Sequence, residues 1–494
     1  MTEGRRLARD EPMVPPVVYA EASVRSVGGS SLFSEGASVT RETVPDFHSE
    51  PGLVEAAVAR LRDAGFGVLQ AGWTTVTIAA PAGLYEEVFG TRVVAEERET
   101  LKYHGRAGTA TYLECPDTEV PGLIDPSGSP LLETIEGVAL NEPVYPQASA
   151  SPPSPGYHHL GVPGDVASGL GADEAHGAGF TGRGVRVVMV DTGWYRHPFF
   201  DRHGYAAVPA VLGPAATDPD RDEDGHGTGE SANLFAVAPE VEFTMVKMNF
   251  ANPAGALKAA IELRPDIISC SWATTKANPP LSASDQATTA AVSEAVRRGI
   301  IVVFAAGNGC YWGFPGQHPD VISAGGVFLR PDGSFEASNY ASGFRSRIYP
   351  GRNVPDVCGL VGQKPYGRYI VMPVEPGGKA DKTSCGAAYP DADETEEDDG
   401  WAVFSGTSAA APQLAGVCAL MKQAYPELSP AQAREVLVQS ARDVVQGRCS
   451  EVWPVDGPEG AGGHEAAPGP DLATGAGLAD PGRAVEMALR LGGA

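Results

Sequence analysis

The chain has 494 residues, 43% of them hydrophobic, and this length exceeds what one hydrophobic core usually supports, which predicts two domains. Its 62 acidic and 36 basic side chains give a net charge of −26, so its surface repels phosphate backbones and anionic lipids. Composition therefore argues against nucleic-acid or membrane-surface binding, and no apolar run approaches the length of a membrane span.

The N-terminal part is predicted to contain a flexible tail and then a small α+β domain. Residues 1–35 are rich in Pro, Ser, Gly and charge and show little periodicity, which predicts the tail. Residues 36–146 form the predicted α+β domain, with the order helix 53–64, strands 66–70 and 74–79, helix 82–89 and strand 92–96. The Pro- and Ser-rich residues 147–156 (QASASPPSPG) predict an exposed linker and a domain boundary.

After the linker, residues 157–494 change to unbroken apolar strands that alternate with amphipathic helices. The predicted strands are 185–190, 242–248, 267–270, 300–305 and 321–324. The predicted helices begin near His226, cover 254–263 and 284–298, begin again at Ser408 and end with a helix at 429–444. This alternation predicts an α/β domain in which helices cover both faces of a parallel sheet.

Three segments each place a reactive side chain beside glycine at the end of a strand or the start of a helix. Asp191 closes a buried strand in VVMVDTGW, His226 begins a helix in DGHGTGES, and Ser408 begins another in FSGTSAAAP. Sites in open parallel sheets form beyond the carboxyl ends of the strands, so we expect these side chains to meet there.

Acyl transfer needs this combination of side chains. A serine hydroxyl is a weak nucleophile unless a base takes its proton, and histidine has a pKa near neutrality. A buried aspartate orients the imidazole and stabilises the imidazolium, so Asp191, His226 and Ser408 are the predicted triad. The backbone N–H of Ser408 at a helix N-terminus, and the side-chain amide of Asn308 in AAGNG, are the predicted oxyanion donors.

The order of the motifs DTG, HGT and GTSxAxP resembles that of the subtilisin family. The resemblance covers roughly residues 160–485 and extends to AVAPEVEFTMVKM, RPDIISCSW, HPDVISAGGV and VPDVCG. It implies a subtilisin-like serine endopeptidase without a redox cofactor or catalytic metal, acting on peptides or proteins. Ser271, Trp272 and Ala273 match the segment whose backbone pairs with an extended substrate. The bulky Trp272 is expected to reshape a substrate subsite.

The N-terminal domain resembles the pro-domain of sedolisin-type peptidases, in LRDAGFGVLQAGWTTVTIAAPAGLYEEVFGTRV and ETIEGVALNEPVYP. This resemblance implies a zymogen whose N-terminal domain is an intramolecular inhibitor or chaperone, with self-cleavage between roughly residues 140 and 175. Two other interpretations stay open. One is an intracellular maturation protease that keeps this domain for substrate selection, and the other is a catalytically silent relative that binds peptides.

Two acidic runs are interpreted as surface loops. Residues 218–225 (DPDRDEDG) are similar to the start of a calcium-binding loop. Such a loop closes with a glutamate, which should stand at Ser231, but the glutamate here is Glu230, one position earlier. We therefore expect a solvated loop, with calcium binding as the alternative. Residues 391–399 (DADETEEDD) predict a disordered surface loop, with metal binding or attraction of basic substrates as the alternatives.

Seven cysteines, an odd number without a CxxC pair, argue against a disulfide framework and against a zinc site. The arginines near the N-terminus have no apolar segment behind them, so no secretory signal is visible. From these two features we expect a cytoplasmic protein.

Overall fold

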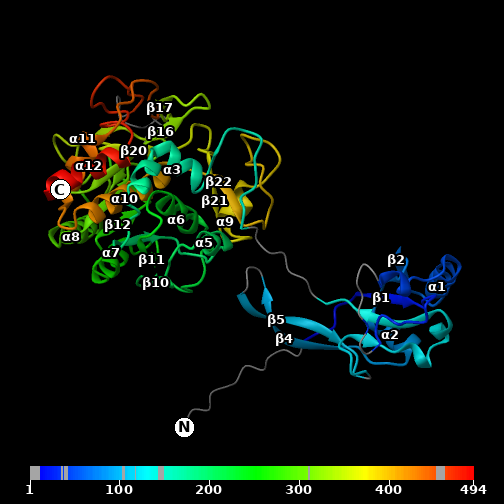
Figure 1. The fold of residues 1–494 in the computed structure, drawn as a ribbon. Helices are drawn as coiled ribbons and strands as arrows, with labels where there is room; N and C mark the ends of the chain where they lie inside the picture. The colour runs from blue at the N-terminus through cyan, green and yellow to red at the C-terminus, as the bar shows by residue number, and fades with distance from the viewer. Residues whose placement is uncertain are drawn as a thin grey trace, which may run out of the picture. The chain divides into compact units, whose positions relative to one another are not determined.

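A computed structural model describes residues 12–34, 37, 43–102, 106–116, 118–142, 150–309, 312–451 and 462–493. The chain divides into two compact units, Met1–Gln147 and Ala148–Ala494, each with its own hydrophobic core (Figure 1). Among the described residues, none of the helices combines the length and the apolar character needed to cross a membrane. The six described cysteines are free thiols, and Cys310 lies outside the described residues.

The N-terminal unit is built on a five-stranded antiparallel sheet with the order β2-β3-β1-β7-β6. The strands are β1 (Val18–Val24), β2 (Gly67–Ala71), β3 (Thr75–Ala80), β6 (Leu123–Ile124) and β7 (Ile135–Leu140). Helices α1 (Pro51–Asp63) and α2 (Ala82–Phe89) bury Leu61 and Tyr85 in the same core as the inward residues of the strands. A hairpin of β4 (Val94–Lys102) and β5 (Arg106–Glu114) completes the unit.

The prediction of a flexible tail over residues 1–35 is wrong for Val18–Val24. This segment is β1, the central strand of the sheet, with β3 on one side and β7 on the other. Its inward residues Val18, Ala20, Ala22 and Val24 are fully buried. The two alanines make the strand alternation weak in the sequence, and its partner strands lie more than fifty residues away along the chain.

The C-terminal unit contains an eight-stranded sheet with the order β10-β11-β9-β12-β14-β16-β17, and β20 also pairs with β16. The strands are β9 (Arg186–Asp191), β10 (Val211–Leu212), β11 (Glu242–Lys247), β12 (Ile267–Cys270), β14 (Ile301–Ala305), β16 (Ile322–Leu329), β17 (Phe335–Ala337) and β20 (Val357–Leu360). All pairings are parallel except that of β17 with β16. The predicted α/β fold with a parallel sheet is confirmed, with β17 as an antiparallel addition.

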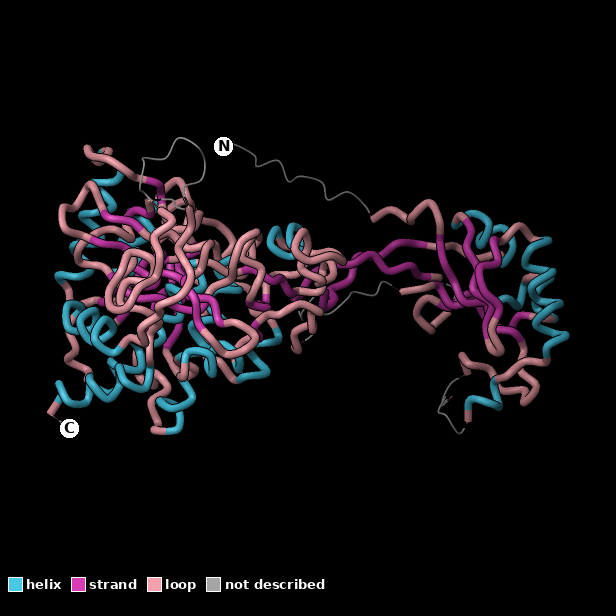
Figure 2. The backbone as a smooth tube through the Cα atoms, turned by 90° about the horizontal axis from the view of Figure 1, so that it is seen from above, coloured by secondary structure: helices cyan, strands magenta, loops and turns pink. Residues whose placement is uncertain are grey.

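Helices cover both faces of this sheet, and alternate residues of β9 belong to two different hydrophobic cores. Val187 and Met189 belong to the core under α6 (His226–Val237) and α10 (Thr407–Ala424). The alternate residues Val188 and Val190 belong to the core under α7 (Pro253–Glu262) and α8 (Ala283–Arg297). Figure 2 shows the strands of this unit enclosed by helices. Because both faces are buried, the interior positions of the strands are mostly apolar, and the charged residues Arg186, Asp191, Glu242 and Lys247 stand at strand ends.

The carboxyl ends of three neighbouring strands carry the residues predicted to form the site. Strand β9 ends at Asp191, β12 ends just before Ser271, and β14 ends three residues before Asn308. Register fixes their proximity, because Cys270 pairs with Val190 on one side and with Phe304 on the other. Helices α6 and α10 begin at the same edge, with His226 and Thr407.

Candidate active site

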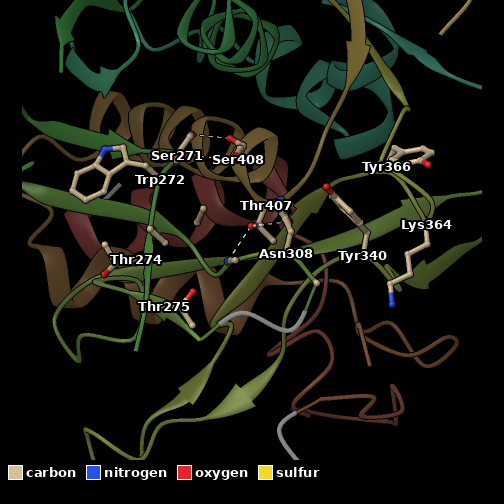
Figure 3. A pocket seen from close by; sticks show the side chains of 14 residues that line it. Ser271, Trp272, Thr274, Thr275, Asn308, Tyr340, Lys364, Tyr366, Thr407 and Ser408 are labelled. Atoms are coloured by element: carbon tan, nitrogen blue, oxygen red, sulfur yellow. Dashed lines mark hydrogen bonds between the residues drawn. The ribbon is translucent and has the colours of Figure 1, made fainter. Parts of the chain in front are cut away.

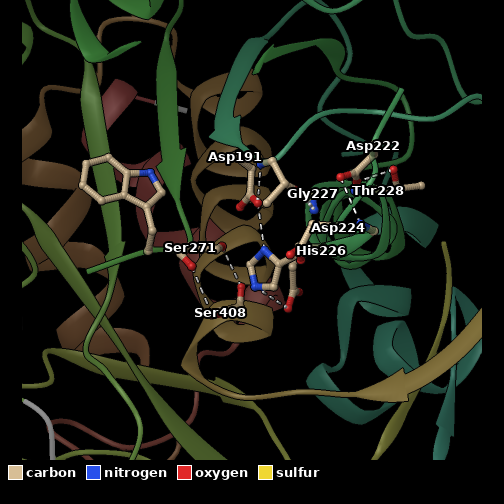
Figure 4. Close-up of polar contacts among 12 residues, drawn as sticks. Asp191, Asp222, Asp224, His226, Gly227, Thr228, Ser271 and Ser408 are labelled. Atoms are coloured by element: carbon tan, nitrogen blue, oxygen red, sulfur yellow. Dashed lines mark hydrogen bonds and ion pairs between the residues drawn. The ribbon is translucent and has the colours of Figure 1, made fainter. Parts of the chain in front are cut away.

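Asp191 and His226 are joined by a hydrogen bond from the imidazole Nδ1 to the carboxylate Oδ1, 2.8 Å long. Asp191 is 1% exposed, and the same oxygen accepts the N–H of Thr192 at 2.7 Å. Since a carboxylate only accepts, Nδ1 of His226 carries a proton and Nε2 is the nitrogen left to act as a base. Figure 4 shows Ser408 beyond this imidazole, on the side away from Asp191.

The turn before α6 brings His226 close to the end of β9. A side chain on Gly227 would collide with the backbone carbonyl of Gly193, so the DTG and HGT motifs need glycine at this close approach. Thr192 Oγ1 accepts the N–H of Gly227 at 2.8 Å and joins the two segments directly. The glycines of the two motifs are therefore explained by backbone packing.

Asp222 closes the N-terminus of α6 and is fully buried. Its carboxylate accepts the N–H groups of Gly225 at 3.0 Å and Thr228 at 2.8 Å, and the hydroxyl of Thr228 at 2.7 Å. Burial raises the pKa of Asp222 to about 6, although these hydrogen bonds favour the ionised form. The expectation that the run 218–225 is a solvated loop is thus wrong for Asp222, which satisfies N–H groups that no helical carbonyl reaches.

Ser408 lies in the first turn of α10 and exchanges two hydrogen bonds with Ser271. The Ser408 hydroxyl donates to the Ser271 carbonyl at 3.1 Å, and the Ser271 hydroxyl donates to the Ser408 carbonyl at 2.8 Å. A hydroxyl has one proton, so in this resting geometry Ser408 does not donate to His226. Catalytic hydrogen bonds are often unformed before substrate binds, so rotation of the Ser408 hydroxyl would complete the triad.

Asn308 is oriented by Thr407, the residue before Ser408. Its side-chain oxygen accepts the N–H of Thr407 at 2.9 Å and the hydroxyl of Thr407 at 3.2 Å. That hydroxyl in turn accepts the N–H of Gly307 at 3.1 Å. With the oxygen held in this way, the NH₂ group of Asn308 is the end left to donate, as an oxyanion donor must.

A pocket of about 620 Å³ opens beside Ser408, and Figure 3 shows its lining. It is lined by Ser271, Trp272, Ala273, Thr274, Thr275, Ala305, Gly307, Asn308, Gly309, Tyr340, Lys364, Tyr366, Thr407 and Ser408. All three residues of the predicted substrate-binding segment belong to this lining. Figure 3 shows that segment on one side of Ser408, with Tyr340, Lys364 and Tyr366 on the other side.

Trp272 is anchored within the protein. Its indole N–H donates to the carbonyl of Val190 at 2.9 Å, and the ring packs edge-on against Phe304 with 5.2 Å between the centroids. The indole therefore supports the sheet edge from which Asp191 projects. Its N–H group has a partner and is not available to a substrate in this conformation.

Glu230 is a site residue that the sequence interpretation missed. It lies one helical turn after His226 on α6, is fully buried, and places Oε1 at 3.8 Å from Nε2 of His226. Burial raises the pKa of the Glu230 carboxyl to about 8. The pKa of His226 is also raised, because the attraction of Asp191, Glu230 and Asp224 outweighs the effect of burial. The i, i+4 spacing on a helix is the sequence signal that would have identified it.

The second acidic run, 391–399, is partly ordered and partly buried. Asp393 is fully buried and accepts the N–H groups of Thr395 at 3.0 Å and Val403 at 2.8 Å. The expectation of a disordered surface loop is therefore wrong at Asp393. In the part of the chain that the structure describes, no group of three or more His, Cys, Asp or Glu side chains is arranged to hold a metal ion.

Several known proteins are similar to this chain. M-protease from Shouchella clausii (strain KSM-K16) is 28% identical over 287 residues, which cover 55% of this chain and 62% of that protein. Subtilisin BL from Lederbergia lenta is also 28% identical over 287 residues, and the match covers 88% of its length. The chain thus spans less than two thirds of M-protease and most of Subtilisin BL. The crystal structure of MycP1 from Mycobacterium smegmatis matches with 20% identity and a TM-score of 0.43, covering 68% of this chain and 89% of that one.

The family model for the subtilase family, Peptidase_S8, matches residues 182–477. This stretch is well over half of the chain and contains Asp191, His226, Asn308 and Ser408. The predicted membership of the subtilisin-like family is confirmed. The chain therefore belongs to the subtilase family.

Proposed function

We propose that this protein hydrolyses peptide bonds through an acyl-enzyme on Ser408, with His226 as the base and Asp191 as its partner. The 2.8 Å hydrogen bond between His226 Nδ1 and Asp191 Oδ1 carries the proposal, because it leaves Nε2 as the basic nitrogen beside Ser408. Subtilase membership and the pocket beside Ser408 support the same reaction.

The first chemical step begins with rotation of the Ser408 hydroxyl from the Ser271 carbonyl towards His226. Nε2 takes the hydroxyl proton while Oγ bonds to the scissile carbonyl carbon, whose C=O electron pair moves onto the oxygen. The backbone N–H of Ser408 and the NH₂ group of Asn308 stabilise that oxyanion. The C–N bond then breaks, and Nε2 returns the proton to the leaving amine. Water repeats the sequence to release the acid and restore Ser408.

Substrate binding is proposed to use the backbone of Ser271, Trp272 and Ala273. The next residues, Thr274–Thr275, form the short strand β13, which pairs with β15 (Gly313–Phe314). A peptide that adds to this segment as an extended strand gains backbone hydrogen bonds that do not depend on its side chains. Its scissile bond then lies over Ser408, at the mouth of the pocket.

The N-terminal unit is proposed to act as an intramolecular inhibitor or chaperone that self-cleavage removes. Support comes from its separate hydrophobic core and from the division of the chain between Gln147 and Ala148. Part of the predicted cleavage range, residues 143–149, lies outside the described residues. A fully active enzyme that keeps this unit would contradict the zymogen proposal and favour a retained domain for substrate selection.

Intact mass measurement after treatment with a fluorophosphonate tests the reaction and the zymogen together. We expect a phosphonyl adduct on the wild type and none on the matched Ser408→Ala variant. The wild-type mass should also show loss of the N-terminal unit, which the variant should retain. An unmodified wild type that still binds peptides would contradict the catalytic proposal and support a silent peptide-binding protein.

A further inference from the structure

Glu230 is a buried carboxyl group whose position points at the proposed catalytic base. The side chain is fully buried, and its Oε1 has no hydrogen-bond partner among the described residues. This oxygen lies 3.8 Å from Nε2 of His226, whereas Asp191 is bonded to the other ring nitrogen, Nδ1. His226 thus has a carboxyl group facing each of its two ring nitrogens.

A chain of buried amides fixes the orientation of Glu230. Asn233 Nδ2 donates to Glu230 Oε2 at 3.0 Å, and Gln413 Nε2 donates to Asn233 Oδ1 at 3.0 Å. Gln413 on α10 is itself held by the backbone of Leu360, with its Oε1 accepting that N–H at 2.7 Å. Because each amide has its oxygen and nitrogen assigned by the next, Oε2 is satisfied and Oε1 is turned towards the imidazole.

The surroundings leave His226 as the group that compensates a charge on Glu230. A buried carboxylate with one hydrogen bond is costly unless a cation faces it. The other titratable groups that act on this pair are Asp191 at the end of β9 and Asp224 in the turn before α6, and both are acids. The neighbours from strands β21 (Ile370–Pro373) and β22 (Trp401–Phe404) and from α10 are uncharged, namely Met372, Phe404 and Ser408.

We propose that Glu230 is a positioning residue of the catalytic set, whose carboxylate stabilises the imidazolium that forms when His226 accepts the proton of Ser408. This inference rests on the proposed function. The transferred proton moves from Ser408 Oγ to Nε2 and later to the leaving amine. Glu230 acts in its ionised form, which burial opposes and the facing imidazolium of His226 favours. His226 is then held as a cation between two carboxylates, and it is a stronger base than a histidine with one.

The pH dependence of kcat/KM separates this role from a structural one. Removing the negative charge with Glu230→Gln lowers the pKa of His226, so the acid limb of the profile moves to lower pH by about one unit or more. The weaker base is less effective once both enzymes are deprotonated. The two profiles should therefore cross, with the variant faster below the crossing and slower above it. The control is Glu242→Gln, which removes an exposed charge at the first residue of β11. This variant should leave the profile unchanged.

A loss of activity by the same factor at every pH, or an unshifted acid limb, would overturn the inference. Glu230→Met provides a second variant, because it is apolar, of similar length and suited to a buried site. It should shift the acid limb in the same direction as glutamine. A shift with glutamine alone would mean that the amide, and not the missing charge, is responsible.

NMR titration of the His226 ring tests the inference without any need for turnover. The measurement uses ¹³C-histidine-labelled Ser408→Ala protein with and without Glu230→Gln, and His226→Gln identifies the signal. We expect a lower pKa for His226 when Glu230 is replaced. Equal midpoints would contradict the inference even in an active enzyme. A further outcome is a shifted midpoint in the Ser408→Ala background while the protein with Ser408 intact cleaves no substrate. That result would contradict the proposed function and leave the coupling between Glu230 and His226 in place.

Discussion

On one side of the pocket, the lining residues follow the ends of buried strands, whereas on the other side they belong to loops. The first region, which we call the catalytic edge, consists of the lining residues Ser271, Asn308 and Ser408 together with Asp191 and His226, which lie outside the lining. The second, the loop wall, consists of Tyr340, Lys364 and Tyr366. The two regions face the same substrate and are constrained in different ways.

The catalytic edge is held by buried polar contacts that connect its residues to each other and to the sheet. At the loop wall, the N–H of Lys364 donates to the side chain of Asn339 at 2.7 Å, and the side chains of Lys364 and Tyr366 are exposed. Tyr366 is 57% exposed, and the guanidinium carbon of Arg368 lies 4.6 Å from the centroid of its ring. From this difference we expect the catalytic edge to determine the reaction and the loop wall to influence which substrates react.

The largest expected effect comes from removing the nucleophile of the catalytic edge. Ser408→Ala should lower kcat/KM on a peptide substrate by about 10⁴-fold or more, because no other group can form the acyl-enzyme. Progress curves with a fluorogenic peptide measure it, and the residual rate should no longer respond to fluorophosphonate. A loss of less than tenfold would place the nucleophile elsewhere.

Removing an oxyanion donor should have the next largest effect. Asn308→Ala should lower kcat by about 10²–10³-fold with little change in KM, because the amide bonds the oxygen only once charge develops on it. Steady-state kinetics of the variant measure this division. If KM rises instead while kcat stays constant, Asn308 binds the ground state and is not an oxyanion donor.

Asp222, in the turn that leads into His226, tests whether a buried carboxyl next to the catalytic edge has a cost in stability. Its pKa is raised to about 6, so the folded protein binds this proton more tightly than the unfolded chain does. The associated stability is present at low pH and is lost as pH rises from about 4 through 6. Relative to Asp222→Asn, the wild type should therefore lose on the order of 3 kcal/mol across this range.

Urea unfolding of both proteins in a Ser408→Ala background, which prevents self-digestion, measures the difference. Asp220→Asn in the same run is the control, because Asp220 is exposed. A difference between wild type and Asp222→Asn that stays constant with pH would show that Asp222 keeps an ordinary pKa.

The smallest effect is expected at the loop wall. Among the described residues that line the pocket, Lys364 alone carries a charge. We expect a peptide paired with residues 271–273 to continue past Ser408 along this wall, so Lys364→Glu should shift preference there from acidic towards basic residues. Since Lys364 is exposed, we expect a change of a few-fold that weakens with added salt. Competition between peptides with Asp or Lys after the scissile bond measures it, and unchanged ratios would remove Lys364 from substrate selection.

The difference between the two regions also explains which residues could be predicted from sequence. Asp191, His226, Asn308 and Ser408 stand in short motifs, because their chemistry requires particular neighbours such as the glycines at the strand and helix ends. Glu230 stands in no such motif, and its spacing of four residues from His226 is its one sequence signal. Its orientation depends on Gln413 and Leu360, which lie far along the chain.

The fold shows the same limit. The unbroken apolar strands of the C-terminal unit were predictable because both faces of their sheet are buried. Strand β1 was not, because small alanines weaken its alternation and its partners come from distant segments. The residues of the loop wall follow no periodicity, and only the folded chain brings Tyr340 and Lys364 to one pocket.

The reciprocal hydrogen bonds between Ser271 and Ser408 give the resting enzyme a form of latency. The carbonyl that accepts the Ser408 hydroxyl belongs to the same backbone segment that is proposed to pair with substrate. A peptide N–H arriving at that carbonyl competes with the hydroxyl and frees it to turn towards His226. Occupancy of the cleft would then activate the nucleophile, so small electrophiles that make no strand pairing, fluorophosphonates among them, should still react with Ser408 but more slowly than peptides do.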